Sequence, residues 1–292
     1  MGLLSMVLSL ILAATLVAQE PALDRARLAS QAQSLAEQLP NLIGTEVLQQ
    51  RSISYSTRMR IRLGEGALRP IAPKIREREI VSELGYALRG KEKPVWFELR
   101  KVISVDGKTV TAPKAARERL AFGLQSDDER ARLKMLEEFT HYGLDGIATD
   151  YGLALLMFRF GDIDKLEFEA RGSEFVGADR VLVVGFRAVG GEMAVTVFDG
   201  NNATRQPAQG TLWLRQADMR PLRIQVLSTL VQNKTEIVDE GVIEYMQSKF
   251  GCALPTSVAY TRKVNGVLVV ETQYRYQPFQ KFGSDAQLKV TP

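Results

Sequence analysis

Few residues in this sequence are suited to nucleophilic or acid–base chemistry. It contains one histidine, His141, and one cysteine, Cys252. A Ser-His-Asp or Cys-His centre would have to use His141, and no motif places it beside Cys252 or Ser126. A histidine at the end of a predicted helix is favoured there by the helix dipole, and a lone cysteine is typically a small buried apolar residue. We therefore predict structural roles for both.

Acidic residues offer a second kind of chemistry. Asp145 and Asp150 lie in one short stretch, and Asp162 and Asp164 lie in another, where carboxylates could bind a hard cation. Neither stretch has the Asp-x-Asp-x-Asp-Gly loop with its following Glu, and turn formation explains both. A carboxylate pair from distant strands, as in glycosidases, leaves a hydrolase open as the least favoured function. We predict no catalytic residues, no metal site and no cofactor.

Residues 53–63 alternate between two kinds of side chain. Because successive strand residues point to opposite faces, the pattern predicts a strand with one apolar face and one basic face. The basic row is typical of a solvated face paired with glutamates at positions 77, 79 and 83, or of a surface for anionic lipid head groups. The apolar residues are Ile53, Tyr55, Met59 and Ile61, and the basic residues are Arg58, Arg60 and Arg62.

Length and charge limit the class of protein. The 292 residues suffice for one large domain or two small ones, and the net charge of +4 is only mildly basic. No block of like charge resembles a nucleic-acid-binding arm, so we predict no nucleic-acid partner. Residues 1–19 are uncharged and largely apolar, which predicts a secretory signal peptide with cleavage near Ala18 or Gln19. A retained signal anchor is the alternative, and no second span follows.

The remaining sequence is mainly strand-like. Spacings of three and four predict helices over 22–39 and 127–142, the second starting at a Ser-x-x-Glu capping box at Ser126. Residues 151–158 fit either a short helix or a buried strand. Asp106-Gly107, Asp199-Gly200 and Asn265-Gly266 predict two-residue hairpin turns. About ten strands are predicted, over 47–63, 75–88, 95–105, 165–170, 180–189, 193–198, 211–214, 222–230, 235–246, 257–264 and 267–279.

Five stretches carry a resemblance to known proteins. SLAEQLPNLIG (34–44), REIVSELGYALRG (78–90), VWFELRKVISVDGKTV (95–110), GTLWLRQADMRPLRIQV (210–226) and FGCALPTSVAYTRKVNG (250–266) occur in this order. The series resembles an uncharacterised family of exported bacterial proteins. Its second half also resembles the superfamily of periplasmic outer-membrane lipoprotein carriers, whose fold the sigma-factor regulators of the envelope share.

The resemblance implies an α+β fold: a large, curved antiparallel sheet, or half-barrel, with a few helices on its concave side. Residues 20–292 would form one domain, with a partly helical insertion or cap at about 106–165. The concave face, which takes up acyl chains in the carriers, would include Ile53, Tyr55, Met59, Ile61, Phe97 and Leu99.

These expectations favour one function over its alternatives. We predict a non-enzymatic, exported protein of the periplasm or the extracellular space, binding a lipid, an acylated protein or another apolar ligand in the hollow of the sheet. The alternative is a protein-interaction or sensor module that docks an envelope partner, with helices filling the hollow. The sheet must be filled by helices or by a ligand, because voids weaken packing.

Overall fold

The computed structural model describes residues 22–55, 72–90, 95–126, 130–145, 150–189, 194–199 and 202–282. Strands account for most of them. They are β1 (Leu42–Ser54), β2 (Lys74–Arg89), β3 (Val95–Val105), β4 (Lys108–Thr109), β5 (Leu166–Val176), β6 (Asp179–Ala188), β7 (Ala194–Asp199), β8 (Asn202–Pro207), β9 (Gln209–Arg215), β10 (Pro221–Gln232), β11 (Thr235–Gln247), β12 (Ala253–Val264), β13 (Val267–Tyr276) and β14 (Gln280–Lys281).

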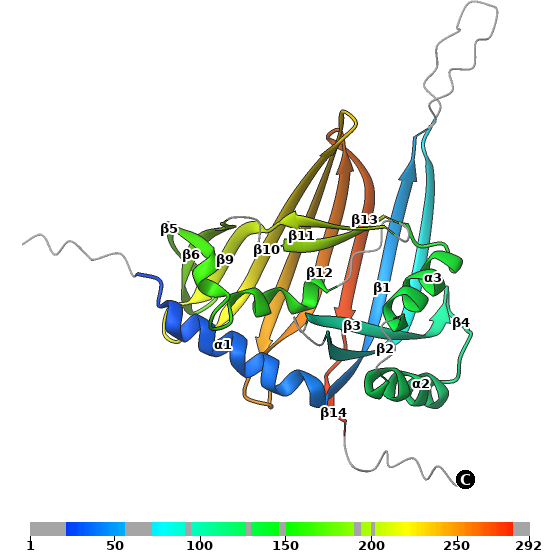
Figure 1. Ribbon diagram of the computed structural model, residues 1–292, viewed down its shortest axis with the longest axis horizontal. Helices are drawn as coiled ribbons and strands as arrows, with labels where there is room; N and C mark the ends of the chain where they lie inside the picture. The colour runs from blue at the N-terminus through cyan, green and yellow to red at the C-terminus, as the bar shows by residue number, and fades with distance from the viewer. Residues whose placement is uncertain are drawn as a thin grey trace, which may run out of the picture.

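Twelve of these strands form one open sheet (Figure 1). Its order is β4-β3-β2-β1-β13-β12-β11-β10-β9-β6-β5, with β14 also paired to β1, while β7 and β8 form a separate two-stranded sheet. Every described pairing in the large sheet is antiparallel. The predicted large antiparallel sheet is therefore confirmed, with twelve strands in it where about ten were expected.

Short turns explain the antiparallel pairing. Asp106 and Gly107 both have positive φ angles between β3 and β4, and Asn265 and Gly266 do so between β12 and β13. These are the conformations that a two-residue hairpin requires, so both predicted turns are confirmed. Gly200 of the third predicted turn lies outside the described residues.

In the described parts of the chain, three α-helices and three 3-10 helices accompany the strands. Asp24 caps the first helix by accepting a hydrogen bond from the Arg27 amide at 3.0 Å. The segment 151–158, which fitted either a helix or a strand, is helical. The helices are α1 (Arg25–Gln38), η1 (Leu39–Asn41), α2 (Pro113–Gln125), α3 (Ala131–His141), η2 (Tyr151–Phe158) and η3 (Ile163–Lys165).

One face of the sheet, here called the inner face, is covered by α1 and η2. The apolar residues of η2 pack against α1, β3, β10, β11 and β12. An element that is apolar on all sides is buried on all sides, which explains the position of η2. Gly241 of β11 makes room for it, because a Cβ at this position would collide with the Tyr151 ring. The inner face is therefore filled by protein over these strands.

Helix α2 packs on the opposite, outer face, which the sequence did not predict. Strand β2 stays paired to β1 as far as Gly85, and its last residues pair only with β3, at the end of the sheet where α2 lies (Figure 1). Ala87 of β2 and Phe97 and Leu99 of β3 form an apolar patch on the outer face there, and Leu120 of α2 packs on it. Helix α2 therefore covers this outer patch, as α1 and η2 cover the inner face.

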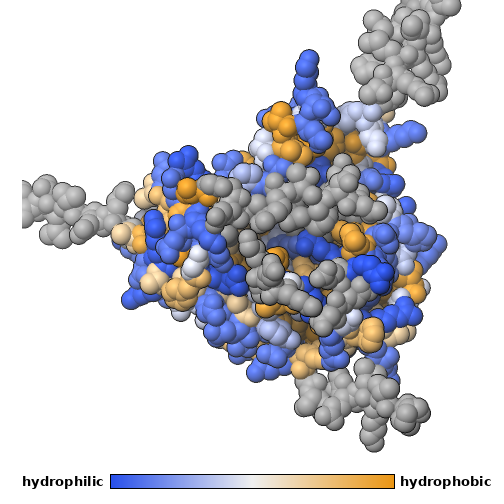
Figure 2. Space-filling view, in the orientation of Figure 1, coloured by the Kyte–Doolittle hydropathy of each residue, from blue (hydrophilic) through white to orange (hydrophobic). Residues whose placement is uncertain are grey.

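The described surface seen in Figure 2 is mixed in polarity. On the side seen in Figure 2, hydrophobic residues form separate small patches among hydrophilic ones. Among the described residues, no helix is both long and apolar enough to cross a bilayer. The predicted signal segment 1–19 and residues 127–129 of the predicted capping box lie outside the described residues.

Candidate functional site

The structure corrects the predicted inner face of the first strand. In β1, the residues buried beneath the helices are Glu46, Leu48, Gln50 and Ser52, so Ile53 belongs to the outer face. Ile53 pairs with Ile75 of β2 there. Tyr55 follows the end of β1 and is 51% exposed. In the described part of the predicted strand, the side that carries Ile53 and Tyr55 is therefore not the side that meets the core, and residues 56–63 lie outside the described residues.

The remaining predicted site residues divide into two groups. Phe97 and Leu99 are buried, as expected, but they face α2 on the outer face and not the hollow under the inner face. Met59 and Ile61, and the basic row Arg58, Arg60 and Arg62, lie outside the described residues.

A groove of about 510 Å³ lies between α2 and α3, over β3. Figure 1 shows the two helices together at the β3–β4 end of the sheet. Leu99 and Leu120 contribute apolar surface, and Phe122 stands on the α2 side with 73% of its surface exposed. The other lining residues are Lys101, Glu118, Arg119, Gly123, Ser126, Ala131 and Lys134. We call this the α2–α3 groove.

Polar contacts fix α2, one wall of the groove. Arg89 of β2 donates hydrogen bonds to the carbonyls of Leu124 and Ser126, both at 2.6 Å, at the helix C-terminus. A cation is favoured there, because the last carbonyls of a helix have no partner within it. Arg117 binds the buried Glu83 of β2 at 3.0 Å. The sequence signal for α2 was Pro113 followed by apolar residues at helical spacing, which the sequence analysis did not use.

Helix α3, the other wall, seals the edge of β3. The backbone amide of Arg100 donates to the Met135 sulfur at 3.2 Å, and that of Glu98 donates to Asp150 Oδ1 at 2.9 Å. These two amides would otherwise be open to another strand. Arg132 of α3 binds Asp150 and lies over the Phe97 ring at 5.7 Å. Helix α3 is thus bound, through Arg132, to Asp150 on the other side of β3.

Behind β3 lies a cluster of charged residues that the sequence analysis missed. Arg100 binds Glu46 through two hydrogen bonds of 2.7 Å and Glu98 through a third of 2.7 Å. All three side chains are only 1% exposed. The Asp150 amide donates to Glu98 Oε2 at 2.8 Å, and the Glu98 amide donates to Asp150 Oδ1, so these two residues bind each other reciprocally. We call Glu46, Glu98, Arg100, Arg132 and Asp150 the buried charge cluster.

The cluster holds three carboxylates against two guanidinium groups. Desolvation by the surrounding protein raises the pKa of Glu46 and of Asp150, although the neighbouring arginines oppose this shift. Burial also raises the pKa of Tyr86 well above its ordinary value. Within the described part of the chain, Glu98 Oε1, Arg100 Nη1 and the Tyr86 hydroxyl have no hydrogen-bond partner. The sequence signal was the charged pair Glu98 and Arg100 on one face of an otherwise apolar strand.

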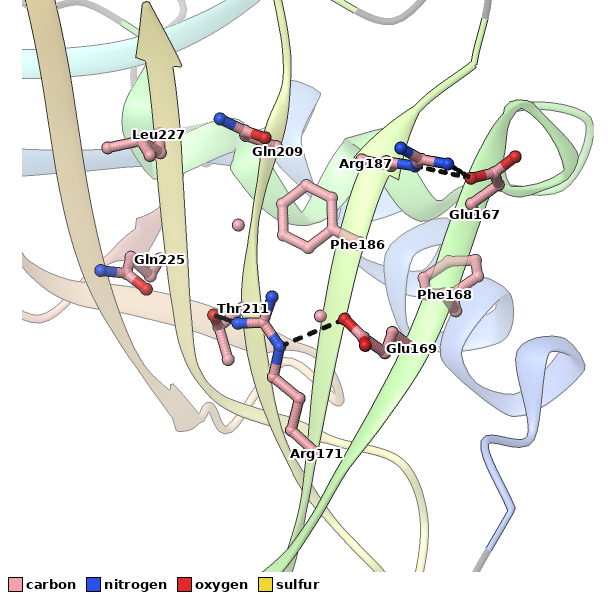
Figure 3. A pocket seen from close by; sticks show the side chains of 12 residues that line it. Glu167, Phe168, Glu169, Arg171, Phe186, Arg187, Gln209, Thr211, Gln225 and Leu227 are labelled. Carbon is pink, nitrogen blue, oxygen red and sulfur yellow. Dashed lines mark hydrogen bonds and ion pairs between the residues drawn. The ribbon is translucent and has the colours of Figure 1, made fainter.

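A second, polar groove of about 610 Å³ crosses β5, β6, β9 and β10 (Figure 3). Arg171 reaches across Gly185 and donates to Thr211 Oγ1 at 2.8 Å, with Glu169 at 3.8 Å. A Cβ on Gly185 would lie 2.6 Å from the Arg171 guanidinium, so only glycine permits this path. Arg187 pairs with Glu167 on the same wall. Both arginines of this groove therefore already have a close oxygen partner, Thr211 for Arg171 and Glu167 for Arg187.

The residues first considered for catalysis occupy structural positions. Cys252 is buried, and burial raises the pKa of its thiol, whereas His141 is exposed and packs edge-on against Tyr142. Asp145 binds Arg76, and Asp162 binds Arg159 and Lys165. Among residues that the structure describes, no group of three His, Cys, Asp or Glu side chains is arranged so that it could hold a metal ion.

Comparison with known proteins adds little to this geometry. No family model matches the sequence, and no curated protein matches it. Among solved structures, the chain is similar to a DUF1329 family protein from Desulfovibrio piger, with 10% sequence identity and a TM-score of 0.37. The match covers 91% of this chain and 95% of that chain. The resemblance to lipoprotein carriers therefore stays a prediction.

Proposed function

We propose that this chain is an exported, non-enzymatic binding protein that holds an apolar ligand, such as a lipid or the acyl group of an acylated protein. The proposed site is the α2–α3 groove and not the hollow beneath the sheet. The inner face already carries α1 and η2, whose apolar residues belong to the main hydrophobic core. An apolar ligand therefore needs another surface, and this groove has an apolar floor.

One observation carries the proposal: Phe122 is 73% exposed beside the buried Leu99 and Leu120. Covering a phenylalanine side chain contributes about 1.5–3 kcal/mol, so a ligand that covered Phe122 would gain this contact. Each buried CH₂ of an acyl chain adds about 0.8 kcal/mol, so even a short groove would give useful affinity. The volume of about 510 Å³ lies in the range of small-ligand sites.

The test compares two exposed phenylalanines. Phe122 in the groove is 73% exposed, and Phe175 near the end of β5 is 74% exposed. Purified protein would be titrated with Nile red, an uncharged apolar dye whose fluorescence rises on leaving water. We expect Phe122→Ser to weaken dye binding at least about fivefold, since roughly 1 kcal/mol of contact is lost. Phe175→Ser should bind like the unmodified protein.

Two results would contradict the proposal. One is the absence of dye binding to the unmodified protein. The other is equal weakening by both substitutions, which would indicate nonspecific adsorption to exposed rings. Because both side chains are largely exposed, neither change should alter folding, and circular dichroism would verify this.

One observation favours a second candidate, a protein-interaction module. Strand β5 ends the sheet at the left of Figure 1, and most of its residues are exposed, including Phe175. An uncovered edge strand can accept a strand from a partner. The same variants test this in reverse: crosslinking in whole envelopes should lose a partner with Phe175→Ser and keep it with Phe122→Ser. Unchanged crosslinking in both would count against it.

A further inference from the structure

The α2–α3 groove is not uniformly apolar, because its lining includes three cations. Lys101, Arg119 and Lys134 line it together with a single carboxylate, Glu118. Lys101 and Leu99 are two residues apart on β3, so both side chains leave the same face of the strand. An ammonium group therefore lies at one end of the apolar floor. An apolar surface with positive charge at one end is complementary to an amphiphile that has an anionic head group.

Lys101 is only weakly engaged by the protein. Its Nζ lies 3.9 Å from Glu138 Oε2, longer than a hydrogen bond, and 31% of its side chain is exposed. Other cations near the groove have close partners: Arg117 binds Glu83 at 3.0 Å, and Arg89 binds the end of α2. Lys101 can thus donate hydrogen bonds to a ligand oxygen without breaking a short ion pair.

We propose that the α2–α3 groove binds a free, single-chain amphiphile with an anionic head, a carboxylate or a phosphate. Its chain lies over Leu99, Leu120 and Phe122, and its head meets Lys101 and Lys134. This inference rests on the proposed function, because it assumes that the groove takes an apolar ligand. A groove of about 510 Å³ suits a single chain better than a two-chain lipid.

Matched ligands separate the head from the chain. Dodecanoate, dodecyl phosphate and dodecanol would each displace Nile red from the intact protein, at low and at high salt. We expect the two anions to bind about tenfold more tightly than the alcohol at low salt, since charge-assisted hydrogen bonds exceed neutral ones in strength. High salt should reduce that advantage, because the lysines are partly exposed and screened.

Variants locate the effect. Lys101→Gln combined with Lys134→Gln should remove most of the preference for the anions and leave dodecanol affinity unchanged. The control is Lys234→Gln with Lys263→Gln, two lysines at the β10–β11 turn and on β12. This pair removes the same charge elsewhere and should preserve the preference.

The outcomes separate the two ideas. Equal affinity for dodecanol and the anions, or equal losses in both double variants, would overturn the anionic head and leave the apolar groove intact. Failure of all three ligands to displace the dye would overturn the proposed function as well. Vesicles containing phosphatidylglycerol provide a further arm. Cosedimentation that depends on Lys101 and Lys134, without binding of the free amphiphiles, would replace the single-chain ligand by a bilayer surface.

Discussion

The two sides of strand β3 reverse the usual relation between polarity and burial. On one side, Glu98 and Arg100 are each 1% exposed inside the buried charge cluster. On the other side, Phe97 and Leu99 are also buried, by α2 and by residues of α3, and Leu99 lines a groove open to solvent. The charged side is therefore deeper in the molecule than the apolar side.

The difference shows that pairing, more than polarity, sets which side of this strand is enclosed. Arg100 forms a bidentate pair with Glu46, which offsets part of the cost of removing both charges from water. The apolar side needs no such partner, so it can border a groove that exchanges water for ligand. Three predictions test this contrast, in decreasing order of expected effect.

Removing the central cation should have the largest effect. Arg100→Ala leaves Glu46 and Glu98 buried without their partner, and we expect a loss of about 3–5 kcal/mol in the free energy of unfolding. Urea denaturation would measure it. The matched control is Arg223→Ala, whose partner Glu244 lies at 2.7 Å on a part-exposed surface. An exposed pair of this kind contributes less than about 1 kcal/mol, so similar losses in both variants would contradict the contrast.

Adding one methyl group on the cluster side of β3 should lower the stability, and adding one on the groove side should raise it. A Cβ on Gly152 would lie 2.5 Å from Glu98 Oε1 and 3.2 Å from the Tyr276 hydroxyl, in the cluster. Gly152→Ala should therefore lower stability by about 1–3 kcal/mol.

The paired substitution is Gly123→Ala in α2, where the nearest atom, Leu99 Cδ1, would be 3.8 Å away. Alanine favours a helix over glycine by about 1 kcal/mol, so this variant should be more stable. It should also bind Nile red more weakly, because the methyl group narrows the groove. Thermal melting compares the two, and destabilisation by Gly123→Ala would show that the groove wall is already closely packed.

The smallest effect concerns pH. Desolvation raises the pKa of Asp150 in the folded state, so the folded protein holds this proton more tightly than the unfolded chain does. The resulting contribution to stability is present at low pH and is lost as the pH rises through the raised pKa. Asp150→Asn removes this titration. As the pH rises from about 4, where an ordinary Asp titrates, urea midpoints should therefore fall more steeply in the unmodified protein than in the variant. Equal slopes of the urea midpoint against pH in the two proteins would contradict a raised pKa of Asp150.

Much of the fold could be predicted from local signals. Helix α1 follows from apolar residues at helical spacing, and the β3–β4 and β12–β13 hairpins follow from Asp-Gly and Asn-Gly turns. Helix α2 was missed because the region 106–165 was interpreted only as a partly helical insertion. Of the candidate site residues, Leu99 lines a groove and Phe97 belongs to the same apolar cluster, although both lie on the unexpected side of the sheet.

The sequence by itself determined where strands alternate, where hairpins turn and which residues share a face. Only the tertiary structure decided which face of each strand is covered, because a period of two defines two faces without saying which one meets a helix. Glu46 binds Arg100, and Asp150 binds Arg132, so these charges neutralise one another only after β1, β3, α3 and the residue before η2 are assembled. Before assembly, Glu98 and Arg100 are only two charged residues on one face of a strand.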